Sequence, residues 1–155
     1  MNKRTVLKSV LAVAILGFVL VFSSCKKEEQ KIIGTWKCQK VEIKELQATP
    51  EIETAVRSLF VLAQGLIKES FGTVEFTKDG KMLSTSNGVA VVSNYAVNGS
   101  KLTLTYPEDA TSTTAEISFK KKEMYMDSDM NGFLGSDDEN SKITKFVVRM
   151  TLEKQ

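Results

Sequence analysis

The chain contains no histidine, and this absence removes several classes of enzyme mechanism. Ser-His-Asp and Cys-His systems need an imidazole base, and catalytic zinc sites usually include imidazole ligands. Carboxylate chemistry would need two acids with well-separated pKa values, and no pair of acids lies on an apolar background that would raise one of them. The sequence therefore predicts a protein that is not an enzyme.

Cysteine is also scarce, because the chain has only Cys25 and Cys38. Cys38 lies in an apolar pattern with Trp36, which predicts a small buried side chain and not a reactive thiol. Cys25 ends an apolar N-terminal run. Once Cys25 is modified, no intramolecular disulfide can form.

The N-terminus has the pattern of an export signal. Three basic residues precede an apolar run over 10–22, which is too short to span a bilayer but typical of a signal peptide. The run ends in Phe22-Ser23-Ser24-Cys25, which resembles a bacterial lipobox. This resemblance implies that residues 1–24 are removed and that Cys25 becomes the acylated first residue of a lipoprotein. The alternative is a plain secretory signal followed by an incidental cysteine.

Residues 25–32 then form the lipidated cysteine and a charged tether. Within it, Lys27-Glu28-Glu29 resembles the surface-export signal of some Gram-negative lipoproteins, although any polar linker could have this composition. We expect an exported protein held by Cys25 in the cell envelope, at the outer membrane or on the cell surface. Removal of three of the 21 basic residues and none of the 19 acidic ones leaves a net charge of −1, which argues against nucleic-acid binding.

The mature part of the chain is dominated by short strands with alternating apolar residues. Asp79-Gly80, Asn87-Gly88 and Asn98-Gly99 are strong hairpin turns, because glycine and asparagine tolerate positive φ. Consecutive hairpins with one apolar face predict an all-β, eight-stranded, up-and-down antiparallel barrel over residues 33–155, with a sandwich as the alternative. The expected strands are 35–46, 73–78, 81–86, 89–97, 101–106, 111–120, 123–127 and 143–153.

Two features interrupt this pattern. The inward parity of the first strand changes between Cys38 and Val41, which predicts a bulge near Gln39-Lys40. Apolar residues then recur at helical spacing over 50–71, after Thr49 as the predicted cap and before Gly72 as the stop. We expect this amphipathic helix to pack its apolar stripe on the barrel, with a lid over a ligand mouth or a membrane contact as alternatives.

Three stretches together resemble a known family. Gly34-Thr35-Trp36 is similar to the Gly-x-Trp signature of lipocalins, and residues 74–80 and 95–104 look like the lipocalin-like domains of small Gram-negative lipoproteins. The resemblance implies that Trp36 closes the barrel floor below an apolar cavity. It also implies an arginine stacked on Trp36, but the one candidate, Arg149, has outward parity.

The inward positions of the strands supply the candidate cavity wall. An eight-stranded barrel can hold one small ligand or fill itself with side chains, so the same residues are also candidates for ordinary core. The predicted wall residues are Trp36, Phe76, Leu102, Leu104, Ile117, Phe119, Phe146 and Val148.

An acidic loop follows the seventh strand and fits the twelve-position calcium-binding pattern. Oxygen donors stand at Asp127, Asp129 and Asn131, glycine follows, and Phe133 offers its carbonyl group. Asp138 occupies the last position in place of the usual glutamate. The pattern predicts a structural calcium ion, while a solvated polar loop would have the same composition.

These observations favour a membrane-anchored, lipocalin-like lipoprotein that binds a small apolar or amphipathic molecule and has no cofactor, apart from the candidate calcium. The alternative is a filled barrel that serves as a structural or interaction lipoprotein of the envelope, stabilised by calcium. The sequence does not identify a protein partner.

Overall fold

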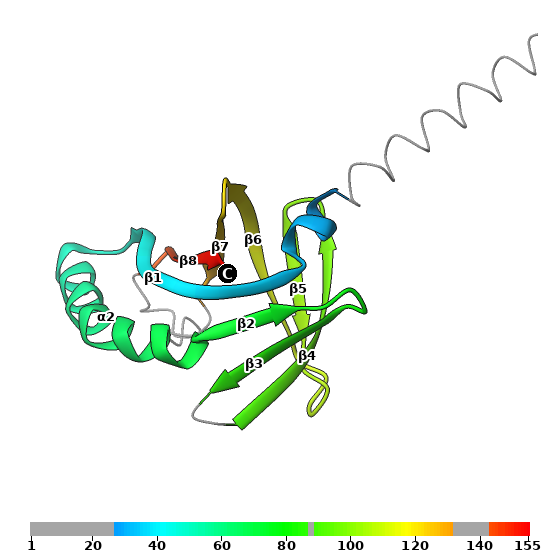
Figure 1. Cartoon of the computed structure of the whole chain (residues 1–155). Helices are drawn as coiled ribbons and strands as arrows, with labels where there is room; N and C mark the ends of the chain where they lie inside the picture. The colour runs from blue at the N-terminus through cyan, green and yellow to red at the C-terminus, as the bar shows by residue number, and fades with distance from the viewer. Residues whose placement is uncertain (1–26, 87–88, 132–142) are drawn as a thin grey trace, which may run out of the picture.

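A computed structural model describes residues 27–86, 89–131 and 143–155. Eight antiparallel strands follow one another around a closed barrel in chain order, and the last strand pairs with the first. Figure 1 shows the long helix α2 beside one end of this barrel. The predicted up-and-down barrel with a helix between its first two strands is confirmed. Its elements are β1 (Gly34–Gln47), α2 (Pro50–Phe71), β2 (Thr73–Phe76), β3 (Lys81–Ser86), β4 (Val89–Asn98), β5 (Lys101–Thr105), β6 (Ser112–Lys120), β7 (Glu123–Asp129) and β8 (Lys145–Lys154).

The tight turns lie where the glycine-containing dipeptides predict them. Gly80 and Gly99 have φ values of 77° and 61°, in the left-handed region that glycine adopts without strain. The Asn87-Gly88 turn lies outside the described residues. These turns fix the register of their hairpins, and the register decides which side chains point inward.

Helix α2 has the predicted boundaries, but its N-terminal cap differs from the prediction. Thr49 is extended at the cap position, yet its side chain makes no capping hydrogen bond. Its hydroxyl oxygen is buried and has no hydrogen-bond partner in the described part of the chain. The first turn is instead stabilised by Pro50, whose ring presets φ, and by Glu51 and Glu53 near the positive end of the helix dipole.

Strand β1 is bulged at two places where its pairing with β8 slips. The first shift falls between Cys38 and Lys40, which confirms the bulge predicted from parity. The second falls between Ile43 and Glu45 and was not predicted. Bulges bend a strand, and these two let β1 pair with β2 at one end and with β8 along the rest of its length.

The end of the barrel where the chain enters is packed shut, and we call it the floor. Ile32 is fully buried just before β1, and its carbonyl oxygen accepts a hydrogen bond of 2.7 Å from Trp36 Nε1. The Trp36 and Phe119 ring centroids are 6.0 Å apart. The Lys154 ammonium group lies 5.2 Å from the centroid of the Trp36 ring, within cation–π distance.

Trp36 therefore lies at the floor, and the cation above its ring is Lys154. Arg149 instead lies over the Tyr125 ring, 5.2 Å from its centroid, and binds Asp127. Its outward parity is confirmed. Around the floor, Leu102, Met124 and Leu152 are fully buried and complete the packing of this half of the barrel.

Candidate ligand-binding cavity

The opposite end of the barrel, which we call the mouth, contains a cavity of about 820 Å³ between α2 and the strands. A volume of this size is typical of sites for small organic molecules. Strands β5 to β8 form its inner wall, and α2 forms the facing wall. Helix α2 lies over the mouth without filling it, and no residue of the helix is buried.

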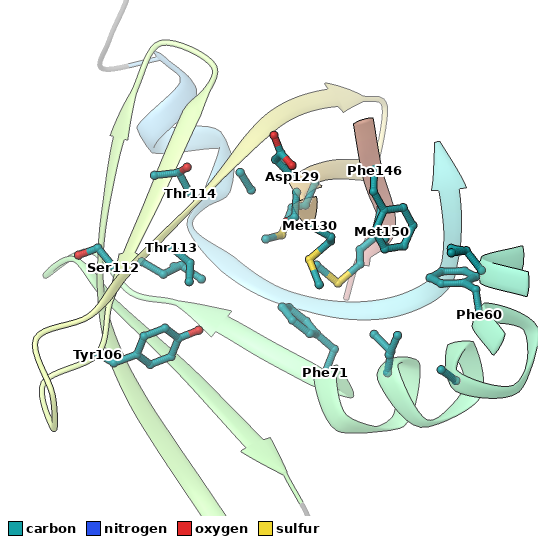
Figure 2. Close-up of a pocket in the computed structure, with 18 of the residues that line it drawn as sticks. Phe60, Phe71, Tyr106, Ser112, Thr113, Thr114, Asp129, Met130, Phe146 and Met150 are labelled. Atoms are coloured by element: carbon teal, nitrogen blue, oxygen red, sulfur yellow. The ribbon is translucent and has the colours of Figure 1, made fainter. Parts of the chain in front are cut away.

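The wall formed by α2 is an apolar stripe at helical spacing. Val56, Phe60, Ala63, Ile67 and Phe71 recur every three or four residues and therefore share one face of the helix. Figure 2 shows this stripe facing the side chains of β7 and β8 across the cavity. The structure confirms that the helix packs its stripe on the barrel, and the same stripe lines the cavity.

Aromatic and thioether side chains form a large part of the cavity wall. The Phe60 and Phe146 rings meet edge to face, with centroids 6.4 Å apart. Met126, Met130 and Met150 line the wall beside them. Methionine is flexible and polarisable, so a wall of this composition can adapt to ligands of different shape.

Only a few polar groups border the cavity, and they lie on β6, on β7 and just after β5. The Tyr106 hydroxyl points toward the middle of the cavity (Figure 2). Thr113 lies on the inward face of β6, and Ser128 and Asp129 end β7. Among the described residues, Asp129 is the one charged residue of the wall.

The structure places the eight predicted wall residues in the barrel interior or packed against it. Three of them line the cavity: Leu104, Phe146 and Val148. The other five lie in the packed half nearer the floor and do not line it. They are Trp36, Phe76, Leu102, Ile117 and Phe119.

Sequence reasoning kept α2 as a lid over the mouth only as an alternative, so the predicted wall included none of its residues and none of the hydroxyl-bearing residues at the mouth. The helical stripe was recognised but assigned to packing, because spacing cannot show whether a helix fills a barrel end or spans it. Tyr106 could have been found from its parity, since it continues the alternation of Leu102 and Leu104.

Two of the candidate calcium ligands have other partners. Both carboxylate oxygens of Asp127 accept hydrogen bonds from Arg149, at 2.7 and 2.9 Å, and Lys44 Nζ lies 2.6 Å from Oδ2. Asp129 Oδ1 accepts a hydrogen bond from the backbone nitrogen of Asn131 at 2.9 Å. The Asn131 side-chain oxygen is buried and has no hydrogen-bond partner within residues 27–86, 89–131 and 143–155.

Phe133 and Asp138 lie outside the described residues, so calcium binding stays a prediction. Within the described part of the chain, no group of three or more acidic, histidine or cysteine side chains is arranged to hold a metal ion. Binding at Asp127 would have to displace Arg149 and Lys44.

Cys38 is buried beside the floor, as predicted. Its burial raises the pKa of the thiol above the ordinary value of 9.0, which lowers the thiolate fraction at neutral pH. Since the thiolate is the reactive form, the structure supports a packing role for this residue.

No protein-family model matches the chain, no curated protein matches it in sequence, and no solved structure matches it. Among the residues described, no helix combines the length and hydrophobicity needed to cross a bilayer. The class of the protein is therefore defined by its architecture: an eight-stranded antiparallel barrel, closed at its floor, with an apolar cavity under a helix at its mouth.

Proposed function

We propose that the protein is a membrane-anchored, lipocalin-like lipoprotein that binds a small apolar or amphipathic molecule and has no enzymatic activity. The cavity of about 820 Å³, with its mostly apolar wall, carries this proposal. Burying apolar ligand surface in such a cavity contributes about 25 cal/mol per Å². The few polar groups at the mouth would orient the polar end of an amphipathic ligand.

The proposed location rests on the N-terminal sequence. The apolar run over 10–22 followed by Ser23-Ser24-Cys25 supports export and acylation at Cys25, with the outer membrane as the expected destination. We expect a Cys25→Ala variant to leave the membrane fraction on cell fractionation. Digestion of intact cells with protease distinguishes a surface location from one inside the envelope, because only a surface protein is degraded.

Native mass spectrometry tests the binding function directly. The barrel closes on itself within residues 34–154, so a chain starting at Lys26 contains every described element. This chain, purified from cells without added lipid, should carry an organic adduct that is released on denaturation. Bare protein under all conditions would contradict a binding function.

A pair of tryptophan variants in α2 shows whether the adduct occupies the cavity. Ala63 lines the cavity, so Ala63→Trp places an indole in the ligand space and should abolish adduct formation. Ala55 is exposed on the same helix and does not line the cavity, so Ala55→Trp should keep the adduct. Circular dichroism of both variants confirms that the barrel is retained.

A second candidate function is a structural or interaction lipoprotein of the envelope. Leu62 and Leu66 favour it, because these α2 side chains are 76% and 69% exposed. An exposed apolar patch often marks a contact with a partner. Calcium bound to the loop after β7 would stabilise a barrel in this role. Bare protein in the adduct experiment, together with self-association or capture of a partner that Leu62→Glu abolishes, would favour this second function.

A further inference from the structure

The distribution of charge around the mouth indicates which ligands the cavity would accept. Among the described residues of the wall, Asp129 is the one charged side chain, and neither lysine nor arginine is present. Asp129 makes no ion pair with any described residue; its carboxylate accepts one hydrogen bond, from the Asn131 backbone. Asp127, two residues earlier, is held instead by Arg149 and Lys44. Among the described residues, the charge at the mouth is therefore negative and has no cationic partner.

The other polar groups of the mouth are uncharged hydroxyls. Tyr106 directs its hydroxyl into the cavity, and this hydroxyl has no hydrogen-bond partner among the described residues (Figure 2). Thr113 adds a second hydroxyl on the inward face of β6. Hydroxyls both donate and accept hydrogen bonds, so they do not select for the sign of a charge. Among the described residues of the wall, Asp129 is the one that can select ligands by charge.

We propose that the cavity selects amphipathic molecules with an apolar body and a cationic head group, accepts neutral ones less well, and disfavours anionic ones such as fatty acids. This inference rests on the proposed ligand-binding function. Asp129 is exposed at the end of β7, so water and salt weaken its field, but its carboxylate still attracts a cation and repels an anion held at the rim of the cavity. Discrimination arises from both effects together.

Three probes with the same alkyl chain test the proposal: decylammonium, 1-decanol and decanoate. Binding to the chain starting at Lys26 is measured by isothermal titration calorimetry at neutral pH and physiological salt. We expect decylammonium to bind at least about tenfold more tightly than decanoate, a difference of about 1.4 kcal/mol, with decanol between them. Equal or tighter binding of decanoate would overturn the charge selectivity while leaving the binding function intact.

Two matched asparagine variants assign the selectivity to one carboxylate. Asp129→Asn keeps the Oδ1 acceptor for the Asn131 nitrogen and removes only the charge. Asp109 makes the same kind of turn contact, accepting a hydrogen bond of 2.9 Å from the Thr111 nitrogen, but does not line the cavity. Asp109→Asn therefore controls for the loss of a similar acid at the same end of the barrel.

We expect Asp129→Asn to bring the affinities for decylammonium and decanoate to within about threefold of each other, since the charge contrast at the mouth is gone. Decanol should bind Asp129→Asn about as well as the unmodified chain, and Asp109→Asn should keep the original ratio. Equal loss of selectivity in both variants would show a general surface field and overturn the proposal. Failure of all three probes to bind the unmodified chain would instead refute the binding function on which the proposal depends.

Discussion

At the scale of single residues, the clearest electrostatic contact is the outer-face cluster of Asp127, Arg149 and Lys44. The Asp127 side chain is only 11% exposed, and Arg149 is paired with it directly across β7 and β8. Hydrogen bonds from Arg149, and then from Lys44, lower the pKa of the Asp127 carboxyl below its ordinary value of 3.8. A lowered folded-state pKa stabilises the fold above the unfolded pKa, and this stabilisation is lost as the pH falls through the folded value.

We predict that Asp127→Asn lowers the free energy of unfolding by about 1–2 kcal/mol at neutral pH, allowing for the partial exposure of Lys44. The difference from the unmodified chain should shrink in strong acid, where Asp127 is protonated in both states. Urea denaturation at neutral pH and at pH values below 3.8 measures both quantities. Glu108→Gln, at an exposed acid with no ion pair among the described residues, is the control. A difference in unfolding free energy between Asp127→Asn and the unmodified chain that stays constant in acid would contradict this explanation.

Ser93, unlike Asp127, is a buried polar residue whose side chain has no stabilising partner among the described residues. Its side chain is fully buried in β4, and its hydroxyl oxygen has no hydrogen-bond partner among the described residues. Burial of an unpaired hydroxyl costs about 1–3 kcal/mol, so we predict that Ser93→Ala raises the free energy of unfolding by about 1 kcal/mol. Thermal and urea denaturation measure the change. A loss of stability would show that the hydroxyl has a partner such as a buried water molecule.

At the scale of elements, strand and helix boundaries followed from local chemistry. Period-2 alternation marked the strands, and dipeptides such as Asp79-Gly80 marked their ends, because both signals depend on neighbouring residues only. The helix over 50–71 and the bulge at Gln39-Lys40 were read from the same kinds of local signal. The observed strand ends differ from the predicted ends by at most two residues. The last residues of an element fray, so its ends are less sharply defined than its interior.

Features that depend on distant parts of the chain were not predictable in the same way. Parity shows that Trp36 and Val148 both point inward, but not that one lies at the floor and the other in the cavity. Lys154 and Trp36 lie in the last and the first strand, and they meet because β8 pairs with β1. Two bulges in β1 shift the register of this pairing. The cavity likewise depends on the distance between α2 and the strands, and the spacing of apolar residues along α2 does not encode that distance.

Helix α2 should open more readily than the strands. It has no buried residue, whereas β7 and β8 contain side chains such as Met124 and Leu152 that are fully buried. Local opening exposes little apolar surface here and therefore costs less free energy than global unfolding. We predict that α2 amides exchange with deuterium at least about tenfold faster than those of β7 and β8. Hydrogen-exchange mass spectrometry tests this, and equal protection of helix and strands would contradict it.

At the scale of the whole molecule, the chain enters the barrel at the end opposite the cavity. Ile32 is buried at the floor, while α2 and the cavity lie at the mouth, and Figure 1 shows the helix far from the described N-terminal residues. The proposed acylation site, Cys25, precedes the first described residue by only two positions, a reach of about 7 Å. An anchor this close would hold the floor against the membrane and turn the mouth away from it.

This geometry gives a prediction for the acylated protein in vesicles that contain a quencher on the lipid head groups. Lys122 is exposed at the floor, where its carbonyl oxygen accepts a hydrogen bond from the Lys154 nitrogen, and Glu108 is exposed in the loop between the cavity residues Tyr106 and Ser112. Fluorophores are attached to Lys122→Cys and Glu108→Cys in separate samples.

Cys38 is buried and its thiol pKa is raised by that burial, so it should remain unlabelled, and the chain without a new cysteine controls for this. We expect the label at position 122 to be quenched several-fold more strongly than the label at 108, because head-group quenching acts over short distances and a barrel formed by residues 34–154 is wider than that range. Equal quenching would mean that the tether lets the barrel turn freely. Stronger quenching at 108 would mean that the mouth faces the membrane, so that a ligand would enter from the lipid phase and not from the surrounding solution.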